Sequence, residues 1–294
     1  MEDLAARRRR VLVDVDWLTD NLHDPALVLL EVDDRPALYH RGHVPGARLV
    51  DWAGDLQDPV RRDLPGPEAM KALWERLGIT AGSTVVFYGD LNNWLAAYGY
   101  WLFTAFGLPD VRLLDGGRQQ WITRGLPLTV DVPGPRERGG APDPVLRQEM
   151  RAGRSDVVAA ARGGHLVDVR TPQEYYGQWL SEPEFPGETA HRPGHIPGAV
   201  NIPWDLAVDL DGCLRPSEEL AELYGAAGLV PEQPVTTYCR IGERSAHTWI
   251  VLHDLLGYRQ VRNYDGSWTE WGSMTGMPIA LGSDRGVMPV DFTG

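Results

Sequence analysis

The sequence predicts an α/β protein made of two tandem copies of one domain, each a mostly parallel sheet flanked by helices. Short apolar runs alternate with longer helical segments along the chain, a pattern typical of strands and helices layered around a parallel sheet. Several blocks of the first half recur in the same order in the second half. The length of 294 residues suits two domains that each bury a core.

The internal repeat rests on four pairs of matching blocks. RGHVPGARLVDW matches PGHIPGAVNIPW, and TVVFYGDLNNW matches PVTTYCRIGER. LLDGGRQQW matches NYDGSWTEW, and GLPL matches GMPI, with offsets of 150 to 152 residues throughout. A period of this length is a whole domain rather than a unit of a solenoid.

The expected elements follow in order along each copy. Buried strands are expected where apolar and β-branched residues run together, at residues 26–32, 83–88, 165–169 and 234–238. Helices that end at a glycine suited to a left-handed cap are expected at residues 67–78, 217–228 and 245–257.

Domain boundaries come from changes in composition. The first, non-catalytic copy is expected over residues 8–130 and the second over residues 151–282. Residues 131–150 begin with DVPGPRERGGAPDP, whose Pro, Gly and Arg content predicts a linker. The four arginines at residues 7–10 lack the apolar stretch of a signal peptide and predict a solvated, mobile tail.

Bulk composition narrows the partners and the compartment. The net charge of −13 disfavours nucleic acid and anionic membrane surfaces as partners. No apolar run reaches the length needed to span a bilayer. The two cysteines, Cys213 and Cys239, cannot form a disulfide framework or a thiolate metal cage. We therefore expect a cytoplasmic protein with free thiols, no metal and no cofactor.

One loop of the second copy has the features of a reactive site. Cys239 follows the strand PVTTY, and a helix is expected to open about five residues later. Ligands of open α/β sheets bind where strand ends meet such helix N-termini. Loop amides, the helix dipole and the charges of Arg240 and Arg244, partly offset by Glu243, favour a thiolate. The sequence therefore predicts a nucleophilic Cys239 with a pKa below the ordinary value of about 8.5.

A buried structural cysteine is the alternative, since cysteine is among the most buried residue types. Such a cysteine gains nothing from neighbouring arginines, which disfavours this interpretation for Cys239. Cys213 fits it, or an ordinary loop position. In the first copy Gly89 occupies the position of Cys239, with no arginine in the residues that follow. The first copy is therefore predicted to be a scaffold without the chemistry.

The tandem copies, the GHIPGA block, the YCRIGERS loop and the NYDGSWTEW block together resemble the two-domain rhodaneses, which are thiosulfate sulfurtransferases. The likeness covers about residues 11–282, and the CRIGER form of the loop is most similar to actinobacterial members. It implies that the C-terminal domain is catalytic and that the active site opens where the two domains meet. It also implies that a cysteine persulfide carries the sulfur between half-reactions.

Residue by residue, the resemblance implies that Cys239 forms the persulfide. The loop after it corresponds to the cradle of the persulfide and of the donor's oxygens. Arg244 is the residue expected to bind substrate, and the other cradle residues are Arg240, Ile241, Gly242, Glu243 and Ser245.

Two departures from the vertebrate rhodaneses affect the binding of anions. This chain has Arg240 and Ile241 where the vertebrate loop has Arg-Lys, and Glu174 where those enzymes have an arginine. The residue that replaces the second anion clamp stays open, with Arg192 as a candidate. Asp168 and Arg170 are expected to support the strand end beside the loop.

The implied reaction is a ping-pong transfer with small-molecule partners. The Cys239 thiolate takes the outer sulfur of thiosulfate, sulfite leaves, and cyanide or a thiol accepts the sulfur. A 3-mercaptopyruvate sulfurtransferase is the nearest alternative, although its loop is nearly uncharged while CRIGER favours a dianion. A cysteine phosphatase is less favoured, because Arg244 gives Cys-x4-Arg instead of Cys-x5-Arg. A non-enzymatic sulfur carrier is the third alternative.

Overall fold

The computed structural model describes residues 3–33, 35–134, 140–163, 165–183 and 187–293. The chain divides into two compact units, Met1–Arg147 with Val208–Leu214, and Gln148–Ala207 with Arg215–Gly294. The expected α/β architecture of two tandem copies is confirmed. The short segment Val208–Leu214 belongs to the first unit although its sequence lies within the second copy. Residues 135–139 of the expected linker lie outside the described residues.

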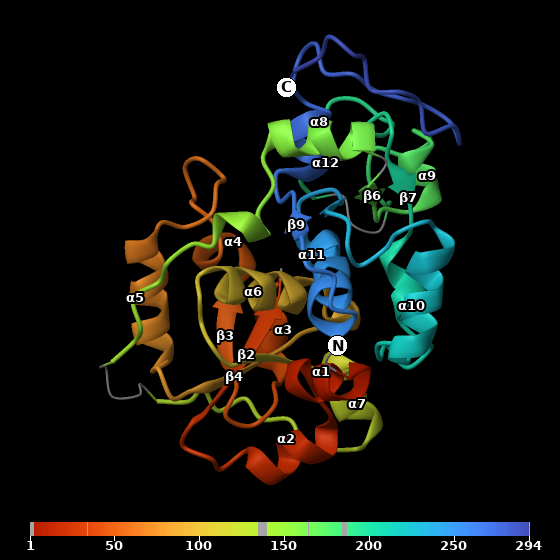
Figure 1. The fold of residues 1–294 in the computed structure, drawn as a ribbon. Coiled ribbons are helices and arrows are strands. Elements are labelled where there is room, and N and C mark those ends of the chain that lie inside the picture. The colour runs from red at the N-terminus through yellow and green to blue at the C-terminus, as the bar shows by residue number, and fades with distance from the viewer. Residues whose placement is uncertain (1–2, 34, 135–139, 164, 184–186, 294) are drawn as a thin grey trace. The chain divides into compact units, whose positions relative to one another are not determined.

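The first unit is built on a parallel sheet with the strand order β1-β5-β4-β2-β3. Figure 1 labels β4, β2 and β3 of this sheet. Its strands are β1 Leu12–Val13, β2 Leu27–Asp33, β3 Arg48–Asp51, β4 Thr84–Tyr88 and β5 Val111–Leu114. Each residue of β2 is buried, as expected of an apolar strand covered on both faces. The strands expected near residues 26–32 and 83–88 are therefore confirmed as β2 and β4.

Helices surround this sheet. They are α1 Leu4–Val11, α2 Val15–Asn21, α3 Pro36–Arg41, α4 Trp52–Asp55, α5 Pro67–Leu77, α6 Trp94–Ala105 and α7 Gly117–Thr123, with a 3-10 turn η1 at Leu91–Asn93. The helix α5 ends at Gly78 in the left-handed conformation, as its sequence predicts. The helix α6 contacts β2, β4 and β5. Its residues are apolar on nearly every side, as expected of a helix that is almost fully buried.

The second unit holds a parallel sheet with the order β7-β6-β8-β9. Its strands are β6 Leu166–Asp168, β7 Val200–Asn201, β8 Val235–Tyr238 and β9 Val261–Asn263. The strand β8 lies inside the sheet, between β6 and β9, so the residue that follows it emerges at the carboxyl edge among neighbouring strand ends. That residue is Cys239.

The helices of the second unit are α8 Arg154–Gly163, α9 Pro172–Tyr175, α10 Ser217–Ala226, α11 Glu243–Trp249 and α12 Ser267–Trp271, with η2 Gln148–Met150, η3 Trp204–Ala207 and the π-helix η4 Ile250–Leu255. The segment expected as a helix at residues 245–257 therefore begins at Glu243, two residues earlier, and continues as η4. The helix α11 contacts β8 and β9, which places its first turn beside Cys239.

The GH-x-PGA turns show the same packing in both units. His43 stacks on Tyr39 with ring centroids 3.7 Å apart, and His195 stacks on Tyr175 at 3.6 Å. Nδ1 of each histidine contacts the main-chain carbonyl of the tyrosine on which it stacks, at 2.9 and 2.8 Å. The sequence repeat is thus a repeat of side-chain packing, and these buried histidines are structural.

The arginine-rich N-terminus is a helix, so the expectation of a mobile tail is wrong. The carboxylate of Asp3 accepts the N–H of Ala5 and caps α1. Arg8 donates to the Asp115 carboxylate at 2.7 Å and to the Leu214 carbonyl at 2.6 Å. Asp115 and Leu214 lie far from Arg8 in the sequence. Local composition therefore predicted solvated arginines and could not show these contacts. Across the described ranges, no helix combines the length and apolarity needed to cross a membrane.

Candidate active site

The main chain of Cys239 is fixed by the recurring YDGSWTEW block. The Cys239 N–H donates to Ser267 Oγ at 3.1 Å, and the Cys239 carbonyl accepts the N–H of Trp268 at 3.1 Å. Ser267 Oγ in turn donates to the Tyr264 carbonyl at 2.7 Å. Both polar groups of the cysteine backbone are therefore satisfied from one neighbouring loop, as a buried position requires.

A glycine closes the loop against that block. Gly242 precedes α11 in the left-handed region, at φ +100°. A Cβ there would lie 2.8 Å from the Cα of Asp265 and 2.9 Å from its carbonyl oxygen, so only glycine fits without displacing the backbone. This turn directs the Gly242 N–H to Cys239 Sγ at 3.1 Å. Asn263 supports the turn by donating from Nδ2 to the Gly242 carbonyl at 3.0 Å.

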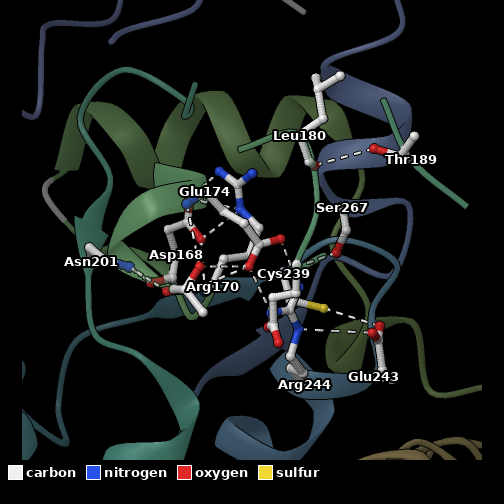
Figure 2. A network of polar contacts seen from close by, with 12 residues as sticks. Asp168, Arg170, Glu174, Leu180, Thr189, Asn201, Cys239, Glu243, Arg244 and Ser267 are labelled. Atoms are coloured by element: carbon white, nitrogen blue, oxygen red, sulfur yellow. Dashed lines mark hydrogen bonds and ion pairs between the residues drawn. The ribbon is translucent and has the colours of Figure 1, made fainter. Parts of the chain in front are cut away.

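The thiol of Cys239 is buried and donates to a carboxylate. Sγ lies 3.2 Å from Glu243 Oε2, as Figure 2 shows. Burial raises the pKa of Cys239, and the charge of Glu243 raises it further, while Arg244 and hydrogen bonds from Ser245 lower it. The expected low pKa is therefore wrong for this arrangement. The sequence interpretation counted the cations of the loop but not the cost of desolvating the sulfur.

Arg244 lies inside the first turn of α11 and forms ion pairs with three carboxylates, the most distant of which is that of Glu243, 3.9 Å from Nε. Its Nη1 is 2.9 Å from Glu174 Oε2 and its Nη2 is 3.1 Å from Glu174 Oε1, a bidentate pair that is fully buried (Figure 2). Nη1 also lies 2.5 Å from Glu182 Oε1. The resemblance marked Glu174 as a departure from the family, and that departure was the only sequence signal for its role. Nothing in the sequence pointed to Glu182.

The other residues expected in the cradle line the same loop. Arg240 and Ile241 are buried, and the Arg240 carbonyl accepts the N–H of Thr269 at 3.0 Å. Burial raises the pKa of Glu182, whereas Arg244 and more weakly Arg240 lower it, so the Arg240 charge acts on Glu182 as well. Ser245 Oγ lies 2.7 Å from Asn263 Oδ1 and 3.1 Å from the Gly242 carbonyl.

The residues expected to support the site, Asp168, Arg170 and Arg192, differ in their hydrogen-bond partners. Arg170 and Asp168, both labelled in Figure 2, form a buried pair, with Nη2 2.6 Å from Oδ2. The Arg170 guanidinium lies over the Trp268 ring at 4.7 Å. The pair lies at the carboxyl end of β6. Arg192 donates from Nε to the Gly272 carbonyl at 3.1 Å and from Nη2 to the Met274 carbonyl. Its guanidinium is therefore committed to main-chain carbonyls, which removes the argument for an anion clamp there.

The second cysteine lies in a different environment. Cys213 belongs to the segment that joins the first unit. Burial raises the pKa of Cys213 to about 12, with added contributions from Asp115, Asp209 and Asp211. An acidic setting of this kind holds the thiol protonated, which disfavours a nucleophilic role.

The first unit keeps the frame of the loop without its chemistry. The Gly89 carbonyl accepts the N–H of Arg118 at 3.0 Å, as the Cys239 carbonyl accepts that of Trp268. A Cβ at Gly89 would lie 2.6 Å from the Val32 carbonyl oxygen, so no cysteine fits there. The structural correspondence of Gly89 and Cys239 agrees with the alignment of the repeat.

The family comparison covers both copies of the repeat. The chain matches the rhodanese-like domain family over residues 14–124 and again over residues 148–274. The chain belongs to the rhodanese family. Relatives include the "Sulfur carrier protein TtuD" of Thermus thermophilus, 50% identical over 93% of this chain and 98% of the relative. A "Putative thiosulfate sulfurtransferase" of Mycolicibacterium smegmatis is 48% identical over 94% of this chain and 99% of its own length.

Solved structures of similar fold include an ergothioneine biosynthesis enzyme and a form of EanB that bears a cysteine persulfide. An anaerobic ergothioneine biosynthesis enzyme from Chlorobium limicola, in complex with trimethyl histidine, has a TM-score of 0.82 and 25% identity. That alignment covers 96% of this chain and 72% of the other. A persulfide form of EanB with ergothioneine has a TM-score of 0.81 and 25% identity, over 94% of this chain and 71% of the other. The names of the curated relatives support a sulfurtransferase of the rhodanese type.

Proposed function

We propose that the chain takes the outer sulfur of thiosulfate, holds it as a persulfide on Cys239, and passes it to cyanide or a thiol. The observation that carries this proposal is the setting of Sγ. The sulfur lies at the carboxyl edge of the sheet, with the Gly242 N–H pointing at it from 3.1 Å and the first turn of α11 beside it. Main-chain N–H groups aimed at a sulfur stabilise the negative charge that develops there during transfer.

In the proposed first half-reaction, sulfur of Cys239 attacks the outer sulfur of thiosulfate. A Cys239 S–S bond forms, the bond between the two sulfurs of thiosulfate breaks, and sulfite leaves with the electron pair. In the second half-reaction the acceptor attacks the outer sulfur of the persulfide, and the Cys239 sulfur leaves. The persulfide form of the structurally similar EanB supports a sulfur-bearing cysteine on this fold.

The structure also bears on which sulfur donor the chain prefers. The charges of Arg240 and Arg244 were the reason to favour dianionic thiosulfate over 3-mercaptopyruvate, and three carboxylates already balance the charge of Arg244. The electrostatic preference for a dianion is therefore weaker than the loop sequence suggested. We keep thiosulfate as the proposed donor because relatives at 48% identity bear that name.

A sulfur carrier is the second candidate. The relative at 50% identity is named a sulfur carrier protein, and a buried persulfide held by loop amides suits storage as well as turnover. In this case the acceptor would be the thiol of a partner, and cyanide would react slowly.

One experiment separates these candidates. The full chain is mixed with excess thiosulfate, and sulfite is measured over time without and with cyanide. Sulfur transfer through Cys239 predicts a burst of sulfite equimolar with the protein, followed by turnover only when cyanide is present. A burst without turnover would identify a carrier, and no burst would contradict both proposals. A faster reaction with 3-mercaptopyruvate than with thiosulfate would reassign the donor.

A further inference from the structure

The carboxylate of Glu243 lies beside the thiol of Cys239, and the sulfur transfer proposed above gives that carboxylate no role. Sγ of Cys239 donates to Glu243 Oε2 at 3.2 Å, and both side chains are buried, at 0% and 1% exposure (Figure 2). We infer that Glu243 is the general base that accepts the thiol proton when Cys239 attacks a sulfur donor. This inference rests on the proposed function and names a further catalytic residue for it.

A base is needed because the thiol is the resting form. Burial and the nearby carboxylate raise the pKa of Cys239. The groups that oppose them are Arg244 and the hydrogen bonds from Ser245. Arg244 is itself bound by Glu174 and Glu182 and also lies 3.9 Å from Oε1 of Glu243, which limits what it contributes at the sulfur. A neutral thiol is a poor nucleophile, so the proton must leave as the new S–S bond forms.

His247 is the other side chain in the first turns of α11 with an ordinary pKa low enough to accept a proton near neutral pH. Its ring is buried and packs edge-on against Trp204, with centroids 5.2 Å apart. Burial lowers the pKa of His247 to about 4. The histidine is therefore neutral at ordinary pH, and its ring packs against the tryptophan. Glu243 is the group whose oxygen meets the S–H directly.

The first unit provides an internal comparison. Asn93 occupies the position of Glu243, and its Oδ1 accepts the N–H of Gly89 at 2.9 Å. In the second unit Ser267 Oγ accepts the corresponding N–H, that of Cys239. The residue at the helix start therefore serves the backbone where there is no thiol. Where there is a thiol, a serine takes over that task and the acidic side chain turns to the sulfur.

The step balances in atoms and charge. The proton of Cys239 passes to Glu243 Oε2 as Sγ attacks the outer sulfur of thiosulfate. The bond between the two thiosulfate sulfurs breaks, and sulfite leaves as the dianion. The products are the persulfide anion on Cys239, the neutral acid of Glu243, and sulfite. Loss of the proton from Glu243 to solvent restores the base for the next cycle.

The test compares Glu243→Gln with wild type, both in a Cys213→Ser background so that Cys239 is the only thiol. The exposed Glu222→Gln in α10 is the matched control. Single-turnover sulfite release and alkylation by iodoacetamide are each measured from pH 5 to pH 10. If Glu243 is the base, wild type is nearly independent of pH around neutrality and reacts more slowly in D2O than in H2O. Glu243→Gln loses about 100-fold or more at pH 7, the usual contribution of general-base catalysis.

A faster reaction of Glu243→Gln than of wild type at pH 7 would overturn the inference. A carboxylate that acts only through its charge raises the pKa of Cys239, so its removal would release more thiolate and make Glu243→Gln faster at pH 7. If Glu243→Gln does not fold, the pH profile and the D2O comparison of wild type still decide. A wild-type rate that rises tenfold per pH unit contradicts a base. Alkylation needs no sulfur donor, so absence of a sulfite burst would contradict the proposed function while the alkylation profile still tests Glu243.

Discussion

The guanidinium of Arg244 and the carboxylate of Glu174 form a buried bidentate ion pair, at 2.9 and 3.1 Å, between the loop after β8 and the helix α9. Thr171 caps α9 by accepting the N–H of Glu174 with its hydroxyl, while its own N–H donates to Glu174 Oε2 at 3.2 Å. The pair thus joins the helix start to the reactive loop. Arg244 is as much a part of the framework of the site as a candidate for binding substrate.

Glu174→Gln should make the free energy of unfolding less dependent on pH in the acid range. Burial acts to raise the pKa of Glu174, but Arg244 and Arg170 hold it at about 2, below its ordinary 4.5. A carboxylate with a lowered folded-state pKa stabilises the fold above its unfolded pKa and loses that contribution as pH falls toward the folded value. Urea unfolding should show a gap between wild type and Glu174→Gln that is widest above pH 5 and narrows by about 3 kcal/mol toward pH 2. A gap that does not change with pH would contradict the assignment.

Arg244 and Glu174 should show strong coupling in a double-mutant cycle. Removal of either partner leaves a buried charge without its bidentate partner, a loss of about 3–5 kcal/mol for each single variant. Arg244→Gln with Glu174→Gln should lose clearly less than the sum of the single changes. The measurement is urea unfolding of the four proteins at pH 7. Additive losses would mean that the two residues do not depend on each other.

Glu182→Gln should improve use of an anionic donor. Glu182 is partly exposed and lies 2.5 Å from Arg244 Nη1, where it balances part of the charge available to an anion. Its removal should lower KM for thiosulfate several-fold and change stability by less than about 1 kcal/mol, as for other partly exposed pairs. The gain should be smaller for monoanionic 3-mercaptopyruvate. An unchanged ratio of kcat/KM for the two donors would show that Arg244 does not select between them, and Glu222→Gln provides the control.

Gly242→Ala should be far more costly than a matched glycine change. Both Gly242 and Gly276 have positive φ, at +100° and +83°, but a Cβ at Gly276 meets nothing within 4 Å. The control Gly276→Ala should therefore lose only about 1 kcal/mol, from backbone strain. Gly242→Ala should lose at least about 2–3 kcal/mol and most of the sulfite burst, because Asp265 must move. Equal losses in the two variants would mean that the packing of Gly242 against Asp265 is unimportant.

The sequence predicted the scaffold well because the scaffold is written as local patterns. The matched histidines of the two GH-x-PGA turns, and the alignment of Gly89 with Cys239, follow from the repeat. The sequence could not predict which charged residues, distant from each other along the chain, pair in the fold. Glu174 lies 70 residues before Arg244 in the chain, and no spacing rule links them. The pKa of Cys239 was misjudged for the same reason, since the burial of the sulfur and the direction of Glu243 are properties of the folded chain.

The most direct test of the account is the mass of the intact chain after brief exposure to thiosulfate, measured for wild type, Cys239→Ser and Cys213→Ser. Cys213 lies in an acidic segment of the first unit, so its replacement is a matched control for loss of a thiol. The account predicts that wild type and Cys213→Ser each gain one sulfur atom and release one equivalent of sulfite, and that Cys239→Ser does neither. A gain of sulfur by Cys239→Ser, or its loss in Cys213→Ser, would contradict the assignment of the persulfide to Cys239.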